Sequence, residues 1–495
     1  MARLPAARGA ALALCSLLIP LSLRAQEGVA FADFFVDSTL RIDYYHSGSK
    51  DQESIGLDHL YRQGAWAGST RHLVDHFGLG RYAALMYDTA SGKLIFSRTY
   101  DTYFGEYRTT APAREGIART FHESVLAPFP RRPVRVVFER RDRRNAYHAL
   151  ASVVVDPGDY HIITESPSRG DSVYETFVSG PLHERVDLLI IGEGYTLGER
   201  GKFETDLRRY TDIFFSWEPY KRLKEKFNVR GIFSPSPEDG VDEPRQGVYR
   251  HTLLGASFNS LDSDRYLLVE DNRLLRDVAA QAPYDALLVM VNSRRYGGGG
   301  LYNDYCCFTS DGTWNEHVML HEFGHAFAGL GDEYYTKDVA YEDFLVKGVE
   351  PNEPNITALL DPAKLKWRDL LSPGISIPTE WGEATYDSLG ALRDSLSTLR
   401  ARLAASGGAV HTREDDARVA ALDTTLRTVN RRLALFFVDH PLRGKVGAFE
   451  GAGYMAKGFY RPTVNSLMNS FNVQERTYYP VNERAIERVI ATFTE

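Results

Sequence analysis

The amino-acid sequence predicts an α/β (α+β) domain that follows an all-β, sandwich-like domain and carries an inserted helical hairpin. Three features of the chain predict this architecture. Short strand patterns joined by polar turns fill its first third, buried strands then alternate with helical segments, and leucines later recur at spacings of three and four. Paired short strands indicate a β-sandwich, whereas alternating strands and helices are typical of α/β domains.

The first 25 residues are typical of a secretory signal peptide. Arg3 and Arg8 give a charged start, residues 12–23 are apolar, and Ala25 closes a plausible cleavage site. No later apolar run is long enough to cross a bilayer, so we expect no transmembrane segment once the signal is removed. The sequence thus predicts a protein secreted to the periplasm, the cell surface or the exterior.

The charge of the chain argues against nucleic acid as a partner. Lys and Arg together number 58 against 66 acidic residues, which gives a formal net charge of -8. Removing residues 1–25 takes away three arginines and no acids, so the mature chain has a formal charge of about -11. Binding to a phosphate backbone calls for the opposite sign.

Residues 26–165 are predicted to form the all-β domain. Alternating apolar residues at 83–87 and 94–100 flank a short polar turn, and the pair at 134–139 and 147–155 repeats the arrangement. A β-sandwich is the simplest fold for such pairs. Its expected role is to bind substrate or a cell surface, or only to support the rest of the chain.

The α/β domain is expected over residues 180–495, after a linker rich in Ser, Pro and Gly near 165–180. A continuous apolar run is typical of a strand buried on both faces, and apolar residues at helical spacing predict helices between such strands. The predicted strands are 186–191, 228–233 and 286–291, and the predicted helices are 199–215 and 264–281.

A helical hairpin is predicted at about 385–437. Apolar residues recur there at alternating spacings of three and four, first from Leu389 to Leu403 and then from Leu422 to Phe436. Residues 406–408 would join the two helices. We expect a structural insertion, although such an arm could also cover a cleft or contact a partner.

The most informative motif is His321-Glu322-Phe323-Gly324-His325. Two imidazoles four residues apart on a helix can reach one metal ion from the same face. A carboxylate beside that ion can take a proton from metal-bound water, which is the chemistry of a zinc hydrolase. Apolar neighbours on both sides predict a buried helix.

A third ligand is expected just after this helix. Gly329 and Gly331 should end it and turn the chain back, because glycine readily takes the left-handed conformation. Asp332 would then approach the histidines as the third ligand, with Glu333 as the alternative. Catalytic zinc commonly has three protein ligands and an open fourth position. The plain alternative for either acid is an exposed position after a helix end.

Other residues near the motif are assigned plainer roles. His317 lies four residues before His321, but no acid follows it as a base, so a structural role is expected. Cys306 and Cys307 are adjacent, a geometry that disfavours a disulfide, and are expected to pack as small apolar groups. The glycines at 297–300 lack the Gly-Lys-Ser/Thr ending of a phosphate loop, so they predict a turn or a close backbone approach to substrate.

The chain resembles the bacterial immunoglobulin A peptidase family of secreted, metzincin-like zinc metallopeptidases. The resemblance rests on HEFGHAFAGLGDEYY at 321–335, YGGGGLYNDYCCFTSD at 296–311 and RPTVNSLMNS at 461–470, and it covers nearly all of the mature chain. It implies a metzincin-like catalytic domain, a bacterial secreted enzyme and Zn2+ as the cofactor.

The same resemblance implies that Met468 lies in the Met-turn beneath the metal, whereas the plain alternative is a methionine that fills a core gap. The chain departs from the general metzincin pattern, because Ala328 holds the expected glycine position and an acid replaces the third histidine. No tyrosine follows Met468 directly. Tyr454 and Tyr460 are therefore the candidates for stabilising the oxyanion.

The sequence as a whole predicts a secreted zinc endopeptidase that acts on proteins or peptides. Zinc held by His321, His325 and Asp332 would activate water, with Glu322 as the general base. One alternative is a zinc amidase or deacylase acting on cell-wall or glycan amides. Another is a non-catalytic surface adhesion protein with a vestigial metal site. The sequence predicts no oligomeric state.

Overall fold

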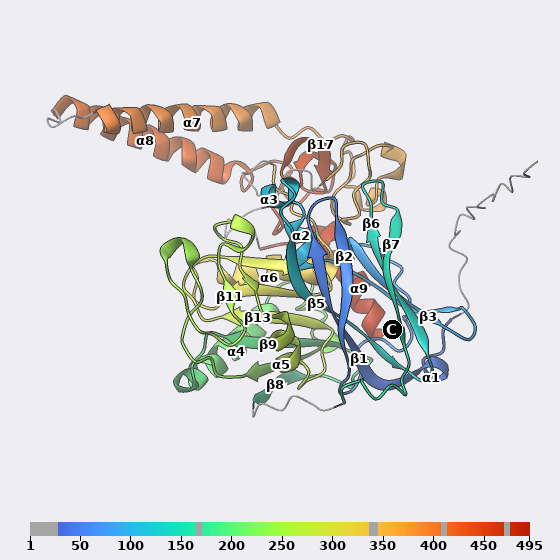
Figure 1. Cartoon of the computed structure of the whole chain (residues 1–495). Helices are drawn as coiled ribbons and strands as arrows, with labels where there is room; N and C mark the ends of the chain where they lie inside the picture. Colours follow the sequence, from blue (N-terminus) through green and yellow to red (C-terminus); the bar gives the residue numbers. More distant parts are fainter. Residues whose placement is uncertain (1–27, 165–170, 336–344, 407–412, 470–475) are drawn as a thin grey trace, which may run out of the picture.

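The chain folds into a mixed α/β structure with several β-sheets (Figure 1). The computed structural model describes residues 28–164, 171–335, 345–406, 413–469 and 476–495. The predicted signal peptide lies outside these residues. Within the described ranges, no helix has the length and apolar character needed to cross a membrane.

Two antiparallel sheets form the N-terminal part of the chain. One has the order β2-β1-β5 and the other the order β4-β3-β6-β7. Both predicted strand pairs are confirmed, as β3 with β4 and as β6 with β7. The strands are β1 (Phe35–Gly48), β2 (Glu53–Arg62), β3 (Tyr82–Asp88), β4 (Leu94–Tyr100), β5 (Arg119–Pro130), β6 (Val134–Arg141) and β7 (Tyr147–Val155).

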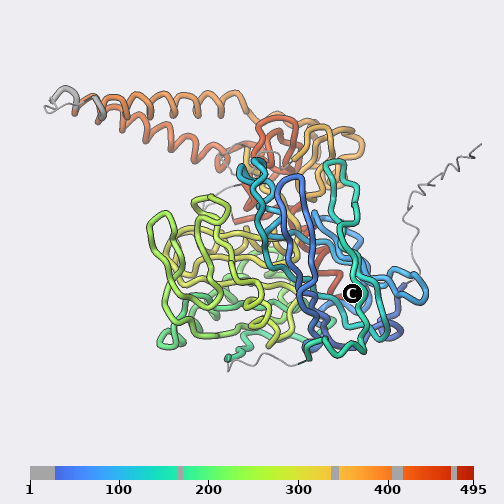
Figure 2. The backbone as a smooth tube through the Cα atoms, in the orientation of Figure 1, coloured from blue at the N-terminus to red at the C-terminus, as the bar shows by residue number. Residues whose placement is uncertain are grey.

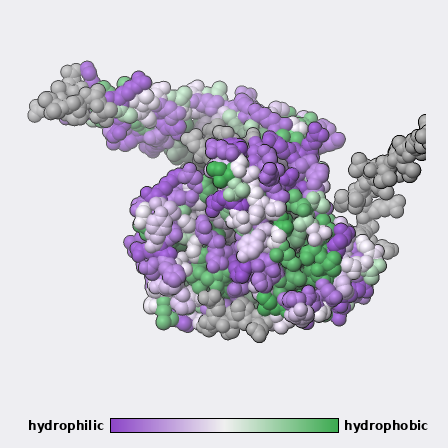
Figure 3. All heavy atoms as spheres, in the orientation of Figure 1, coloured by the Kyte–Doolittle hydropathy of each residue, from purple (hydrophilic) through white to green (hydrophobic). Residues whose placement is uncertain are grey.

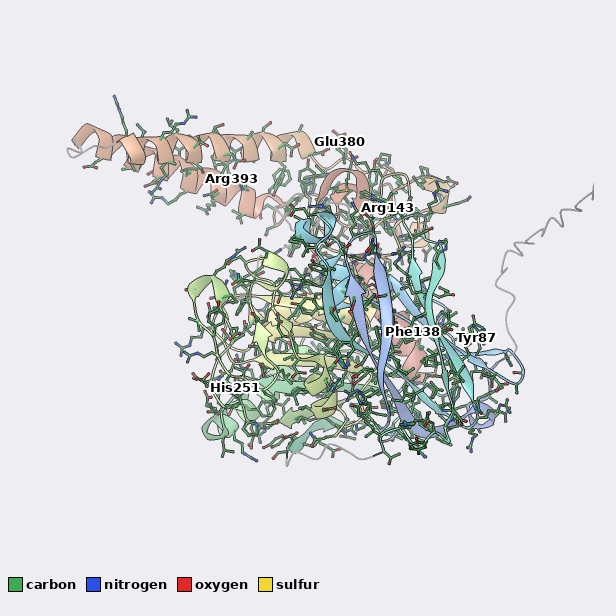
Figure 4. All side chains as sticks on the ribbon, in the orientation of Figure 1. Tyr87, Phe138, Arg143, His251, Glu380 and Arg393 are labelled. Atoms are coloured by element: carbon green, nitrogen blue, oxygen red, sulfur yellow. The ribbon has the colours of Figure 1, made fainter. Side chains whose placement is uncertain are left out.

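Apolar side chains of both sheets share one core. Phe138 of β6 lies among these strands (Figure 4) and packs in the same cluster as Tyr44 of β1 and Val125 of β5. Alternating residues of each strand point to this core, which is the pattern expected for two packed sheets. The short helices of this region are α1 (Phe31–Phe34), α2 (Tyr103–Tyr107) and α3 (Ala111–Arg114).

A six-stranded sheet organises the rest of the chain, in the order β14-β15-β13-β9-β10-β8. The central strands β15, β13, β9 and β10 run parallel, and the outer strands β14 and β8 run antiparallel to their neighbours. The strands are β8 (Ser172–Val178), β9 (Val186–Glu193), β10 (Phe227–Phe233), β13 (Ala286–Val291), β14 (Gly298–Leu301) and β15 (Tyr305–Thr309).

Both faces of this sheet are covered. The helices α4 (Arg200–Phe214), α6 (Asn315–Ala328) and α9 (Tyr479–Thr494) pack on one face, and α5 (Asn272–Ala279) packs on the other. The second face also receives Phe104 of α2, so the N-terminal region adds to this core. Figure 2 shows the blue N-terminal strands beside the green and yellow sheet.

The predicted elements at 186–191, 199–215, 228–233 and 286–291 are confirmed as β9, α4, β10 and β13. Three other expectations differ from the structure. The expected linker contains β8, which pairs with β10 and is rich in the β-branched and aromatic residues that suit a strand, such as Val173, Tyr174 and Phe177. Part of the expected helix at 264–281 is extended, since the Asp271 side chain accepts from the Leu274 amide and starts α5 there.

The glycines at 298–300 form β14 and not a turn, which is the third difference. A Cβ at Gly298 would lie 2.9 Å from Glu322 Cγ, and one at Gly300 would lie 2.6 Å from the Glu322 carbonyl oxygen. Only glycine therefore lets this strand lie directly on α6. The close approach predicted for these glycines is to the helix of the motif.

The two leucine-rich segments form α7 (Glu383–Ser406) and α8 (Arg413–Phe436), which lie side by side and project from the body as an arm (Figure 1). Tyr386 and Phe436 meet Trp381 at its base, so the helices run antiparallel. The arm surface is mostly hydrophilic in Figure 3 and carries Arg393 (Figure 4). The remaining strands are β11 (Ala256–Ser257), β12 (Leu268–Val269), β16 (Phe449–Ala452) and β17 (Met455–Arg461).

Candidate metal centre

Helix α6 carries the histidine motif, and Gly329 ends it. Gly329 is left-handed, with φ of 60°, and the Leu330 amide donates to the Gly324 carbonyl at 3.2 Å. This is the bonding of a glycine-capped helix end, as predicted. Gly331 has a different role, because a Cβ there would lie 2.5 Å from Ile356. The chain thus reverses within three residues and returns to the helix.

The reversal brings Asp332 to the two histidines. Nε2 of His321 and Nε2 of His325 lie 3.1 Å apart. Oδ1 of Asp332 lies 3.1 Å from the first nitrogen and 3.4 Å from the second. Three possible ligand atoms therefore form a nearly equilateral triangle.

The size of this triangle fits zinc. Ligands at 2.0–2.1 Å in tetrahedral geometry lie about 3.3–3.4 Å from one another. Asp332 Oδ1 is buried and has no hydrogen-bond partner among the described residues, as expected of an atom reserved for an ion. Burial would raise the pKa of Asp332, but His325 and His321 hold it well below its usual value, so the group is a carboxylate.

Both imidazoles are oriented by main-chain carbonyls. Nδ1 of His321 donates to the Leu467 carbonyl at 3.2 Å, and Nδ1 of His325 donates to the Leu330 carbonyl at 2.5 Å. A proton on Nδ1 leaves the Nε2 lone pair for a metal, and such second-layer bonds also raise the basicity of a ligand. The donor set of two imidazoles and a carboxylate therefore points its lone pairs at one place.

Tyr454 holds the third member of the triangle. Its hydroxyl donates a short hydrogen bond to Asp332 Oδ2, while the Gly453 amide donates to the Asp332 carbonyl at 2.9 Å. Both residues lie in the turn between β16 and β17, where Tyr454 has a positive φ of 63°. Tyr460 lies elsewhere, with its hydroxyl 3.5 Å from Glu450. Of the two tyrosine candidates, the structure thus places only Tyr454 at the centre.

Glu333 points away from the histidines into a buried polar network. Its carboxylate accepts from Asn355 at 2.9 Å, from Asn482 at 3.0 Å and from Ser466 at 2.6 Å. Asn355 also exchanges two hydrogen bonds with the backbone of Gly331. The network therefore fixes the loop that presents Asp332.

Met468 lies beneath the helix of the motif. A Cβ at Gly324 would lie 3.1 Å from the Met468 sulfur, so the glycine between the two histidines makes room for it. The carbonyl of Met468 accepts from the Glu333 amide at 2.9 Å, and the preceding residue, Leu467, orients His321. This turn supports the centre without supplying a ligand.

Glu322 lines a cavity of about 150 Å³ together with the triangle. Burial raises the pKa of Glu322, while the neighbouring His321 and His325 oppose that rise. Gly298 and Gly300 of β14 also line the cavity and lie directly against Glu322. A peptide in this cavity would therefore meet the metal position, the carboxylate and a strand edge at once.

His317 and the two cysteines stay outside the triangle. The His317 ring stacks on His321 at 6.1 Å, and burial lowers the pKa of His317 to about 3, so its ring is neutral. Cys306 and Cys307 are buried free thiols that pack in the cores on opposite faces of the sheet, because they are consecutive in β15. The structure therefore places them as packing residues.

A second group of possible ligands is ion-paired already. Asp43, Asp58 and His122 lie close together in the N-terminal sheet. Arg41 pairs with Asp43 at 2.5 Å, and Arg273 of α5 pairs with Asp58. Arginine thus supplies the positive charge that a metal would bring, so this group joins the two parts of the chain.

Comparison with known protein families decides the identity. The family model described as IgA Peptidase M64 matches residues 175–490, well over half of the chain. The chain belongs to the IgA peptidase M64 family. The model described as Peptidase M64 N-terminus matches residues 30–151, so the N-terminal sheets are also part of the family pattern. None of the curated proteins compared with the chain matches it.

Membership in the M64 family makes the chain a peptidase, that is, a hydrolase of peptide substrates, and implies a metallopeptidase. Several residues that this M64 peptidase places around its cavity were not predicted from the sequence. Arg265, Tyr296 and Tyr334 lie on one side, and Leu79 and Asp101 of the N-terminal region lie on the other. Tyr296 and Tyr334 lie in the sequence stretches quoted above, but no local pattern there or around the other three indicates a place in the cavity. Asn355 and Ser466 were missed for the same reason.

Proposed function

We propose that this M64 peptidase is a secreted, zinc-dependent endopeptidase with Glu322 as its general base. One observation carries the proposal: Nε2 of His321, Nε2 of His325 and Oδ1 of Asp332 converge within 3.1–3.4 Å, beside Glu322, in one cavity. A set of two imidazoles and a carboxylate on a helix of this kind is typical of catalytic zinc.

Zinc and Glu322 have separate roles in the proposed hydrolysis. Bound zinc would polarise the scissile carbonyl and lower the pKa of water. Glu322 accepts a proton from the attacking water and returns it to the leaving amine. Its raised pKa suits both steps, since a carboxyl group that titrates nearer to neutral pH exchanges protons more readily. The Tyr454 hydroxyl donates its one proton to Asp332 Oδ2 and so orients the third ligand.

The proposal extends to the architecture. We assign a metzincin-like catalytic domain to residues 180–495, with Met468 as its Met-turn and a helical hairpin inserted at about 385–437. Support comes from the contact between Met468 and Gly324 and from the antiparallel α7 and α8. Residues 26–165 would form an accessory sandwich domain, and residues 1–25 would direct secretion.

Metal analysis and one isosteric variant test the function. The purified protein is expected to hold about one zinc per chain by mass spectrometry and to cleave unstructured protein internally. Glu322→Gln should keep the zinc and lose peptide hydrolysis by about a thousandfold or more. Glu316→Gln, in the first turn of the same helix but outside the cavity, is the matched control and should stay active.

Two results would contradict the proposal. One is a protein that binds no transition metal after zinc is supplied. The other is a Glu322→Gln variant with full activity. Digestion of a protein panel beside amide-bearing glycans distinguishes a peptidase from an amidase of the same metal chemistry.

A further inference from the structure

The cavity of the metal centre has a charged group that the catalytic proposal leaves unused. Among the described residues that line it, Arg265 is the one lysine or arginine. The side chain is half-buried. An arginine stays charged at any physiological pH and presents a planar fork of donors that matches a carboxylate.

The main chain fixes Arg265 against the edge strand. The Gly298 amide donates to the Arg265 carbonyl at 3.2 Å, and the Leu267 amide donates to the Gly298 carbonyl at 3.1 Å. Tyr266 thus pairs with Gly298 at the start of β14. A turn at Arg265, followed by the bridge at Tyr266 and the short strand β12, replaces the helix expected there and brings the arginine to the cavity.

The guanidinium lies close to the metal ligands without reaching them. Its Cζ is 5.9 Å from the centre of the Tyr334 ring, and that ring is 5.9 Å from the His321 ring. Burial would lower the pKa of Arg265, but Tyr334, Tyr296, Tyr454 and Asp332 raise it, so the positive charge is retained. An extended peptide rises about 3.3 Å per residue, so Arg265 lies within about three to four residues of the scissile bond.

The opposite end of the cavity carries negative charge. Asp101, Glu106 and Glu353 line it there, and the Asp101 amide donates to the Tyr302 carbonyl at 2.8 Å. Gly298 begins β14 and Tyr302 directly follows it, so the two ends are separated by roughly the length of this strand, about 10 Å. Arg81 partly neutralises the negative charge at this end, because its guanidinium forms an ion pair with Glu106 at 3.0 Å. Its main-chain amide also donates a hydrogen bond to the Asp101 carboxylate at 2.8 Å. The cavity therefore has a positive side chain, Arg265, at one end and acidic side chains at the other.

We propose that Arg265 binds a carboxylate of the substrate and so gives the peptidase a preference for acidic peptides. The inference rests on the proposed function, because it assigns a specificity residue to the same site. The carboxylate can be an Asp or Glu side chain near the scissile bond or the free C-terminus of a short substrate. Both sources offer the same bidentate partner to the guanidinium.

A set of peptides that differ only in the position of one carboxylate tests the proposal. Glu is placed at each of three positions on either side of the cleaved bond and compared with Gln, and each C-terminal acid is compared with its amide. The wild-type zinc enzyme should favour Glu at one position, or the free acid, by about tenfold in kcat/KM, as a charge-assisted pair is worth about one such factor. Arg265→Gln should lose this preference, and Arg265→Glu should favour Lys instead.

Control measurements distinguish a loss of substrate preference from damage to the structure of the site. Zinc content should stay near wild type in Arg265→Gln, because Arg265 is not a member of the ligand triangle. The exposed Arg294, which does not line the cavity, provides the matched Arg294→Gln control and should keep the preference. If the preference appears when Glu is compared with Gln, the carboxylate is that of an acidic side chain. If it appears when the C-terminal acid is compared with its amide, the carboxylate is the free C-terminus.

Binding measured without turnover keeps the inference separate from the catalytic proposal. Calorimetry with Glu322→Gln compares acidic and neutral peptides directly, with and without Arg265→Gln in the same chain. Equal affinity for both peptides, or a preference that survives Arg265→Gln, would overturn the inference. A wild-type protein that hydrolyses no peptide would overturn the proposed function instead, whatever the binding result.

Discussion

The hydroxyl of Ser466 donates a hydrogen bond of 2.6 Å to the carboxylate of Glu333. This bond joins the residue after Asp332 to the turn that carries Met468, although 133 positions separate the two partners in sequence. Asp332 and Glu333, although adjacent, therefore have different roles. Asp332 faces the histidines, and Glu333 fastens the loop from behind.

The two acids should respond differently to removal. Asp332→Ala is expected to lose zinc while the fold is retained, because it removes one vertex of the triangle. Glu333→Ala should lower the free energy of unfolding by about 3 kcal/mol, since buried donors of Asn355, Asn482 and Ser466 lose their acceptor. Zinc content by mass spectrometry and denaturant unfolding measure the two effects. Loss of zinc only from Glu333→Ala, with a stable fold, would reverse the assignment.

Tyr454→Phe should weaken the centre without breaking the fold. The change removes the hydroxyl that donates to Asp332 Oδ2, and loss of such a partner commonly lowers metal affinity by roughly 10–100-fold. Zinc competition with a chromogenic chelator measures the affinity. Tyr460→Phe is the control, because that hydroxyl lies near Glu450 outside the cavity. Equal affinities for both variants would show that Tyr454 does not support the ligand.

Gly300→Ala should separate β14 from α6. The new methyl group would lie 2.6 Å from the Glu322 carbonyl oxygen and 3.2 Å from His325 Cβ, so the strand has to move. We expect a loss of about 2 kcal/mol in stability and a larger fall in kcat/KM. Gly390→Ala in α7 meets nothing within 4 Å and should stabilise its helix by about 1 kcal/mol. A fully active Gly300→Ala enzyme would show that the close contact is dispensable.

The N-terminal sheets should be most stable between about pH 4.5 and 6.5. His46 bonds Glu123 at 2.8 Å and Glu53 at 2.9 Å. Burial lowers the pKa of His46, but the two carboxylates outweigh it and raise the pKa to about 9, from 6.5. Burial raises the pKa of Glu53, but His46, Arg108 and Arg140 lower it to about 2, from 4.5.

The stabilisation from His46 is therefore complete below pH 6.5 and is lost as the pH rises through 9, and that from Glu53 is lost as the pH falls from 4.5 through 2. Hydrogen exchange of the β1 and β5 amides measures this local stability. His46→Gln should remove the decline above pH 6.5, which amounts to about 3 kcal/mol. An unchanged decline in that variant would assign it to another group.

The helix of the motif was predictable because its determinants are local. The spacing of His321 and His325, the apolar face around them and the glycine at 329 all lie within one segment, and α6 ends where that glycine predicts. The strand pairs of the N-terminal sheets were predictable for the same reason, since a short turn sets each pair.

The parts of the fold and of the site that the sequence did not predict depend on packing between distant segments. Glycines are rare in strands, so 297–300 predicted a turn or a close approach to substrate, and the packing of 298–300 against α6 follows only from the assembled sheet. The apolar spacing of 264–281 predicted one helix, whereas pairing of Tyr266 with Gly298 keeps its first part extended. The place of Arg265 in the cavity could not be predicted for that reason.

The pairing of β8 with β10 determines where this protein can be divided. The pattern of the sequence suggests a cut near residue 180, but such a cut would remove β8 and leave the β10 edge with unpaired amides and carbonyls. Open strand edges recruit other chains and promote aggregation. A catalytic fragment intended for expression should therefore begin before Ser172, and one without the N-terminal sheets would also expose the apolar surface that Phe104 covers.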